Sequence, residues 1–280
     1  MQHELEVVTE IIREAGAIVL KHYQAGAEAD EYKDGEPVTA ADRESDDFIV
    51  GALRRAFPDD EIVSEESIDE LVRPRDDVPV PGDAAAAHAP PRVWYVDPMD
   101  GTSDFVKRTD DFVVMIGLAI AGWPVLGAVY HPPSGTLYRG GNGMVAEKLA
   151  GTERTELRVS DVAEPNQARL VVSRSHTPDI VAGMAAQLGI DKMEKCGSVG
   201  LKAARVAEGA GELYLHPSIG TKLWDTCAPE AILVAAGGMF TDCDGKPLVY
   251  DPARVHNERG VFASNGRLHE VVVQQISGVW

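Results

Sequence analysis

The sequence predicts an α/β fold, because helical and strand-like segments alternate along the chain. Residues 5–19 carry apolar side chains three and four positions apart, which is the pattern of a buried helix face. Residues 62–64 form a short apolar run of the kind that predicts a buried strand. The chain has 280 residues, of which 44% are hydrophobic. That length suits either two sub-domains sharing a core or one large layered domain.

The first half is expected to place helices beside an antiparallel sheet. Thr39 precedes a second helical run, which ends at residues 57–58. A turn at residues 121–124 should join two strands as an antiparallel pair. Residues 73–92 are rich in Pro, Asp and Ala and lack periodicity, so we expect a mobile surface loop there. Strands are predicted at residues 62–64, 93–96, 112–120 and 125–130.

The second half is expected to begin near residue 150, which divides the chain into residues 1–149 and 150–280. Strands and helices alternate here as well, and we find no internal repeat. Gly237 and Gly238 follow the last of these helices, where glycine is a typical stop. Strands are predicted at residues 170–172 and 212–215, and helices at residues 178–189, 198–209 and 228–236.

Composition excludes several classes of partner. The formal net charge of −19 argues against a nucleic acid polymer or an anionic membrane. No apolar run approaches about 18 residues, so we expect no membrane span. The N-terminus lacks the basic start and apolar stretch of a signal peptide, which predicts a cytoplasmic protein. The three cysteines form no C-x-x-C pair and are expected to be reduced, buried thiols.

The densest chemical signal is the run D-P-M-D-G-T at residues 97–102, directly after a predicted strand. Asp97 and Asp100 can turn toward one point, and carboxylate oxygens suit Mg²⁺. Gly101 lets the backbone approach a ligand, and the following residues would open a helix whose free N–H groups bind phosphate. The alternative is an ordinary Asp-Pro turn followed by a capping Asp. The density of specified residues favours the functional interpretation.

Two further acidic elements lie upstream of this run. Glu65 and Glu66 follow a predicted strand, although a bare Glu-Glu pair is more often a solvated acidic turn. Thr39 and Asp42 have the spacing of a helix capping box, which would by itself explain them.

Asp225 lies in the run W-D-T-C-A-P-E, near a predicted helix start. Pro229 is expected in the first helical turn, where proline is tolerated. Asp225 would then sit at or just before the helix start, and a simple cap is the alternative. Both roles are compatible, because a capping Asp can keep one oxygen for a metal.

Together these elements resemble the lithium-sensitive, Mg²⁺-dependent phosphatases of the inositol monophosphatase superfamily. The pattern comprises V-T-x-A-D, a Glu-Glu pair, D-P-x-D-G-T and a late W-D, all present here in order. The resemblance spans nearly the whole chain. It implies a layered α-β-α-β-α sandwich of the sugar-phosphatase type, and roughly two or three Mg²⁺ ions at the site.

The resemblance also implies roles for individual residues. Thr102 and Asp42 would orient the attacking water, with Glu65 also counted as catalytic. Which of Glu65 and Glu66 binds metal is less determined, and the family places the first there. The metal ligands would be Glu65, Asp97, Met99 through its carbonyl, Asp100 and Asp225. The substrate contacts would be Gly101, Thr102, Ser103, Arg174, His176, Ser198 and Lys202.

The second half points to a substrate. The runs V-S-R-S-H at residues 172–176 and G-S-V-G-L-K at residues 197–202 resemble the 3′(2′),5′-bisphosphate nucleotidase branch. That branch removes the 3′-phosphate of 3′-phosphoadenosine 5′-phosphate. Arg174, His176 and Lys202 would meet the second phosphate or the adenosine. The alternative for each is a solvated surface side chain.

Other functions remain open at this point. An inositol monophosphatase or a related sugar phosphatase would carry the same metal motifs. A protein of another class, a catalytically silent Mg²⁺- or nucleotide-binding sensor, is disfavoured by the intact Thr102 and Asp42. The expected partner is a small phosphorylated metabolite, a bisphosphorylated adenosine nucleotide in the preferred reading, and a homodimer is compatible with the sequence.

Overall fold

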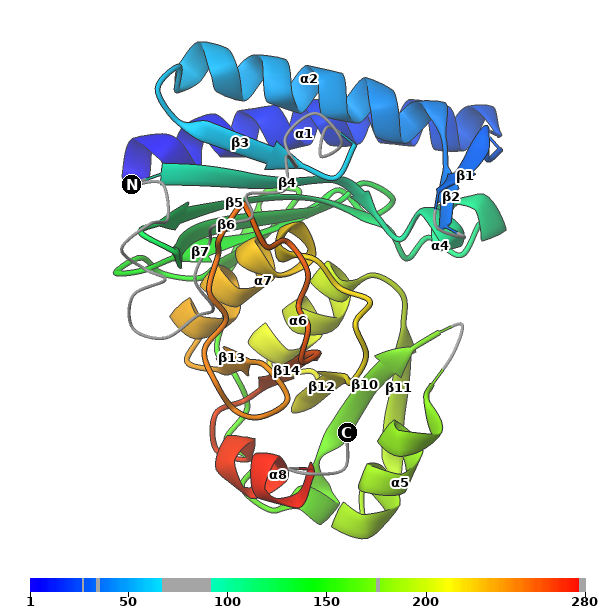
Figure 1. Cartoon of the computed structure of the whole chain (residues 1–280), viewed down its shortest axis with the longest axis vertical. Helices are drawn as coiled ribbons and strands as arrows, with labels where there is room; N and C mark the ends of the chain where they lie inside the picture. The colour runs from blue at the N-terminus through cyan, green and yellow to red at the C-terminus, as the bar shows by residue number, and fades with distance from the viewer. Residues whose placement is uncertain (27, 34–35, 67–91, 175–176, 277–280) are drawn as a thin grey trace.

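Helical and sheet layers alternate through the molecule in the order helix, sheet, helix, sheet, helix (Figure 1). The computed structural model describes residues 1–26, 28–33, 36–66, 92–174 and 177–276. This arrangement confirms the predicted α/β fold with layered sheets and helices.

The first layer consists of α1 (Gln2–Ala25) and α2 (Ala40–Ala56), which pack side by side on one sheet face (Figure 1). The hairpin of β1 (Glu31–Lys33) and β2 (Glu36–Val38) lies between them in sequence. Thr39 caps α2 in a capping box, as predicted. The predicted apolar face of α1 is buried in its entirety: Leu5, Val8, Ile12, Ala15 and Val19.

Seven strands in chain order form the first sheet. β3 runs parallel to β4, and each later pair of neighbours is antiparallel. All the strands predicted for the first half are present here. Their bounds are β3 (Glu61–Ser64), β4 (Arg92–Asp100), β5 (Val113–Ile120), β6 (Trp123–His131), β7 (Thr136–Gly141), β8 (Glu147–Ala150) and β9 (Glu153–Glu156).

Five strands form the second sheet, in the order β11-β10-β12-β14-β13. The helices α5 (Asp179–Leu188) and α8 (His269–Ile276) cover its outer face (Figure 1). A 3-10 turn, η2 (Pro165–Gln167), leads into this sheet. The strand bounds are β10 (Arg169–Ser173), β11 (Lys192–Cys196), β12 (Leu213–His216), β13 (Met239–Thr241) and β14 (Val261–Ser264).

The helices α6 (Val199–Ala207) and α7 (Leu223–Ala235) lie between the two sheets (Figure 1). Glycines let α7 approach the first sheet closely. A Cβ on Gly127 would lie 2.2 Å from the Ala228 carbonyl oxygen, and one on Gly117 would lie 2.6 Å from the Ala228 nitrogen. Because α7 carries Asp225, this close seating fixes how far that carboxylate lies from the first sheet.

The start of α7 differs from the prediction. The helix begins at Leu223, earlier than expected, so Pro229 lies inside it and not in its first turn. Asp225 therefore occupies the third helical position, and Lys222 is the capping residue. Sequence reasoning placed the start too late because it took Pro229 as a first-turn signal.

Strand β4 also extends further than predicted. It runs through Asp97 and Asp100, with a register shift between them, instead of ending at residue 96. The expected loop at residues 73–92 lies outside the described residues, apart from Arg92 at the start of β4. Strand β9 continues the first sheet past residue 150, and the division of the chain there stays a prediction. Among the described residues, no helix is long and apolar enough to cross a membrane.

Candidate active site

The irregularity in β4 creates the turn that carries the acidic motif. Asp97 pairs with Met115 and Asp100 with Val113, so the extra residues between them bulge out of the sheet. The Met99 N–H donates to Asp97 Oδ1 at 3.0 Å and stabilises the bulge. Both carboxylates consequently lie at one end of β4 instead of on opposite faces of a regular strand.

Gly101 is required immediately after this bulge. Its φ of 99° lies in the left-handed region, and a Cβ there would lie 2.6 Å from the Asp111 carbonyl oxygen. The helix α4 (Thr102–Lys107) begins at the next residue, as the motif predicted. Ser103 lies in its first turn, where backbone N–H groups lack partners within a helix.

Thr102 and Asp42 meet as the motif pattern implied. Thr102 Oγ1 lies 3.0 Å from Asp42 Oδ1 and 3.1 Å from the Met99 carbonyl oxygen. Thr39 donates to the other oxygen, Asp42 Oδ2, from its N–H at 2.8 Å and its hydroxyl at 2.7 Å. Asp42 is thus held by the capping box and keeps one oxygen for the Thr102 hydroxyl, so the capping role leaves room for the predicted catalytic role.

Sequence reasoning missed a polar layer beneath this pair. Ser45 donates to the Pro98 carbonyl at 3.0 Å, and the Ser64 hydroxyl donates to Asp46. All three of these side chains are buried. The sequence contained a signal for this layer. Asp42, Ser45 and Asp46 share the face of α2 that also buries Ile49 and Leu53. Polar side chains on a buried helix face require hydrogen-bond partners.

Asp100 is bound by the start of α6. The Ser198 hydroxyl donates to Asp100 Oδ2 at 2.5 Å, and the Gly200 N–H donates to the same oxygen at 2.9 Å. Lys202, on the next turn, is 6% exposed and its charge acts on Asp100. We expected Lys202, in the second half of the chain, to lie away from the metal motifs, and its place beside Asp100 shows that this expectation is wrong. Its position follows from the packing of α6 between the sheets, which no local pattern reveals.

Asp225 approaches the same place from α7. Its Oδ2 accepts the Lys222 N–H at 2.7 Å, which is the capping bond, and its side chain is hydrogen-bonded to Asp97. Asp225 therefore combines a role in the capping box of α7 with membership of the acidic cluster, although it lies two residues inside the helix and not at or before its start.

The four predicted carboxylates repel one another. Burial and the charges of Asp225 and other nearby acids raise the pKa of Glu65 well above its usual value. Burial and the charge of Glu65 do the same to the pKa of Asp97, and burial and Asp100 raise the pKa of Asp225 to about 7. A bound cation would relieve this repulsion.

The donor set fits a hard divalent cation, since carboxylate and carbonyl oxygens are the ligands that Mg²⁺ prefers. Among the described residues, however, no three acidic, His or Cys side chains are already arranged to hold a metal ion. Three of the four carboxylates have partners within the protein. Asp100 Oδ2 accepts from Ser198 and Gly200, and Asp97 is bonded to Asp225.

The predicted substrate contacts of the second half have different outcomes. Arg174 is 41% exposed and forms an ion pair with Asp111, with its NH2 group 2.6 Å from Asp111 Oδ2. His176 lies outside the described residues. Ser198 and Lys202 lie beside Asp100. These two predicted substrate contacts therefore belong to the surroundings of the acidic cluster.

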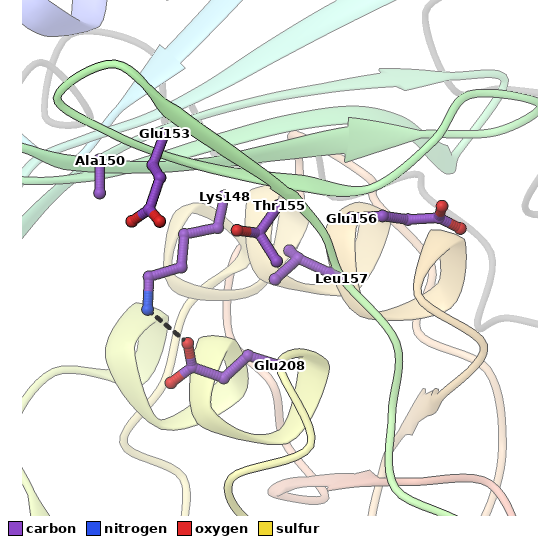
Figure 2. A pocket seen from close by; sticks show the side chains of 7 residues that line it. All are labelled: Lys148, Ala150, Glu153, Thr155, Glu156, Leu157 and Glu208. Atoms are coloured by element: carbon purple, nitrogen blue, oxygen red, sulfur yellow. Dashed lines mark hydrogen bonds and ion pairs between the residues drawn. The ribbon is translucent and has the colours of Figure 1, made fainter.

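A cavity of about 220 Å³ lies elsewhere, between the β8–β9 hairpin and the C-terminal end of α6 (Figure 2). In it, Lys148 Nζ pairs with Glu208 Oε2 at 2.7 Å. None of the predicted site residues lines this cavity, and its acidic lining is unsuited to a phosphate. The lining residues are Lys148, Ala150, Glu153, Thr155, Glu156, Leu157 and Glu208.

The layered fold and the acidic cluster beside a helix start suit a hydrolase of phosphoric monoesters, which is the class that the family and the named relatives show for this chain. The chain belongs to the Inositol monophosphatase family, whose family model matches residues 1–280. The predicted family is therefore confirmed.

Relatives with known names cover most of the chain. The 3′(2′),5′-bisphosphate nucleotidase CysQ of Salmonella typhimurium is 38% identical over 252 residues, which are 89% of this chain and 94% of the relative. CysQ of Escherichia coli K12 is 36% identical over 251 residues, with the same coverage.

Solved structures share the fold. CysQ from Bacteroides thetaiotaomicron superimposes with a TM-score of 0.75 at 27% identity, covering 95% of this chain and 98% of that one. An inositol monophosphatase from Anabaena gives a TM-score of 0.74 at 28% identity, covering 100% and 99%.

Proposed function

We propose that the protein is a 3′(2′),5′-bisphosphate nucleotidase that hydrolyses 3′-phosphoadenosine 5′-phosphate to AMP and phosphate. The observation that carries the proposal is the similarity to CysQ nucleotidases at 36–38% identity over 89% of the chain. The proposed substrate carries two phosphates, so it offers the protein a second anionic group to bind beyond the phosphate that is removed. Lys202 is buried beside Asp100, and its contact with that second group stays a prediction.

The cation that this site requires is proposed to be Mg²⁺, as family members generally use it. Glu65, Asp97, Asp100, Asp225 and the Met99 carbonyl are the proposed ligands. When bound, Mg²⁺ would lower the pKa of a coordinated water and neutralise the phosphate oxygens. That the site binds roughly two or three Mg²⁺ ions stays a prediction.

Thr102 and Asp42 are proposed to orient the attacking water. Asp42 Oδ1 accepts a hydrogen bond from the Thr102 hydroxyl, so the Thr102 oxygen can itself accept a hydrogen bond from water. The Gly101, Thr102 and Ser103 backbone N–H groups at the start of α4 are proposed to hold the transferred phosphate. Arg174, His176 and Ser198 remain predicted substrate contacts.

Phosphate release from a substrate panel tests this proposal. We expect turnover of 3′-phosphoadenosine 5′-phosphate that exceeds turnover of inositol 1-phosphate, requires Mg²⁺ and vanishes in excess chelator. From the family resemblance, millimolar Li⁺ should inhibit. A preference for inositol 1-phosphate would overturn the substrate assignment, and full activity in chelator would overturn the metal requirement.

A cytoplasmic location and a homodimer also stay predictions. Cell fractionation and the solution mass of the purified protein test them directly.

A further inference from the structure

We propose that Asp111 is a positioning residue that holds the turn into α6, residues 197–200 including the first two residues of the helix, against Asp100. The turn supplies the two donors that bind Asp100, so its placement sets the orientation of a proposed metal ligand. The consequence for catalysis rests on the proposed function, whereas the positioning itself does not.

Asp111 joins the two halves of the protein through one oxygen. Its Oδ2 accepts the Gly197 N–H at 2.7 Å and the Arg174 Nε–H at 2.6 Å. Gly197 opens the turn, and Arg174 follows β10. Asp111 itself precedes β5 of the first sheet. One carboxylate oxygen thereby ties the second half to the first at the edge of the acidic cluster.

The turn is tightly enclosed and strained. A Cβ on Gly197 would lie 2.5 Å from Asp104 Oδ2 and 2.5 Å from Asp111 Cβ, so only glycine fits. Ser198 combines a φ of 55° with a ψ of 139°, a backbone conformation that non-glycine residues rarely adopt. Such a conformation persists when its surroundings hold it. Here Asp111 binds one end of the turn, and Asp100 binds Ser198 and Gly200 at the other.

The segment carrying Asp111 is itself anchored. Arg108 and Asp110 both have left-handed φ values, 61° and 65°. The Arg108 guanidinium lies 3.9 Å from the centre of the Tyr23 ring, and the Tyr23 hydroxyl donates to Asp110 Oδ1 at 2.6 Å. His131 Nε2 donates to the Asp110 carbonyl at 2.6 Å. Contacts from α1 and β6 therefore fix the loop at residues 108–111. Asp111 is for this reason held in place by its own segment.

Amide hydrogen exchange of the metal-free protein tests the positioning without reference to activity. In Asp111→Ala, we expect the backbone amides of residues 197–201 to exchange about ten- to a hundredfold faster, because the Gly197 N–H loses its acceptor. Asp111→Asn keeps an oxygen for that N–H and should show a smaller increase. Arg174→Gln removes the ion pair alone and should leave the Gly197 amide protected.

Asp244→Ala is the matched control. Asp244 Oδ2 also accepts Arg259 Nε and NH2, at 2.9 and 2.7 Å, but lies away from the turn. Its loss should leave exchange at residues 197–201 and activity unchanged. Unaltered exchange at these residues in Asp111→Ala would overturn the proposal, as would an equal increase over the whole second sheet.

Activity measurements complete the test. We expect Asp111→Ala to lower kcat about ten- to a hundredfold and to raise the Mg²⁺ concentration for half-maximal activity, with a smaller change in the nucleotide KM. A change confined to KM would contradict an action through Asp100. If wild-type protein fails to hydrolyse the nucleotide, the proposed function is wrong, and the exchange result still decides the role of Asp111.

Discussion

Asp97 illustrates the conflict between binding and stability at a single residue. It is 1% exposed, and burial together with the charge of Glu65 raises its pKa well above the usual value. The folded protein therefore favours the neutral form of Asp97, whereas a cation would favour the charged form. Groups that a site requires can thus destabilise the fold that carries them.

Asp97→Asn should separate these effects. In chelator we expect the variant to be more stable than wild type by about 1–2 kcal/mol, because a repelled carboxylate becomes a neutral amide. The amide oxygen can still accept the Met99 N–H. With Mg²⁺ we expect the order to reverse and most turnover to be lost. Thermal unfolding with and without Mg²⁺, beside phosphate release, measures both. A variant with wild-type kcat would exclude Asp97 as a ligand.

Lys202 allows a comparable test of the substrate. Burial lowers its pKa, and the charge of Asp100 opposes that shift. Lys202→Met keeps the apolar stem and should lower kcat/KM for the bisphosphate nucleotide about ten- to a hundredfold, with a smaller loss for inositol 1-phosphate. Steady-state kinetics on both substrates measures the difference. Equal losses would instead assign Lys202 to holding Asp100, and no loss would exclude both roles.

At the scale of elements, the glycines under α7 decide where Asp225 lies. The Gly127→Ala methyl group would meet the Ala228 carbonyl at 2.2 Å and should displace the helix. We expect the unfolding free energy to fall by about 1–3 kcal/mol and activity to fall with it. Chemical denaturation and phosphate release measure these effects.

Gly183→Ala serves as the matched control. Gly183 lies within α5, and no atom lies within 4 Å of the position its Cβ would take. There the same substitution should raise stability by about 0.5–1 kcal/mol and leave activity unchanged. A Gly127→Ala protein as stable as wild type would show that α7 shifts without cost.

The elements also show where sequence reasoning succeeds. Periodicity placed α1, and the capping box placed the start of α2, because each depends on local spacing. The start of α7 was wrong, since tertiary packing tolerates Pro229 inside a helix. The motifs identified the residues of the acidic cluster, whereas the burial of Lys202 and the contacts of Asp111 depend on how distant segments pack.

At the scale of the whole molecule, the net charge of −19 should weaken the fold at low ionic strength. Raising the salt from about 0.01 M to about 0.1 M shortens the Debye length from about 30 Å to about 10 Å. We expect the Tm to rise by about 2–4 °C, the equivalent of about 1 kcal/mol. Calorimetry in KCl with chelator present measures this. A falling Tm would mean that surface ion pairs, such as Arg43 with Asp30, outweigh the general repulsion.

The order of strands in the second sheet has a consequence for biosynthesis. Strand β14 lies between β12 and β13, and Ala263 aligns with both Tyr214 and Phe240. During translation the ribosome must therefore release the chain beyond residue 264 before that sheet can close. Until then the nascent polypeptide exposes two unpaired strand edges, which are prone to aggregation. A chaperone that shields the growing chain would thus be needed longest for this half.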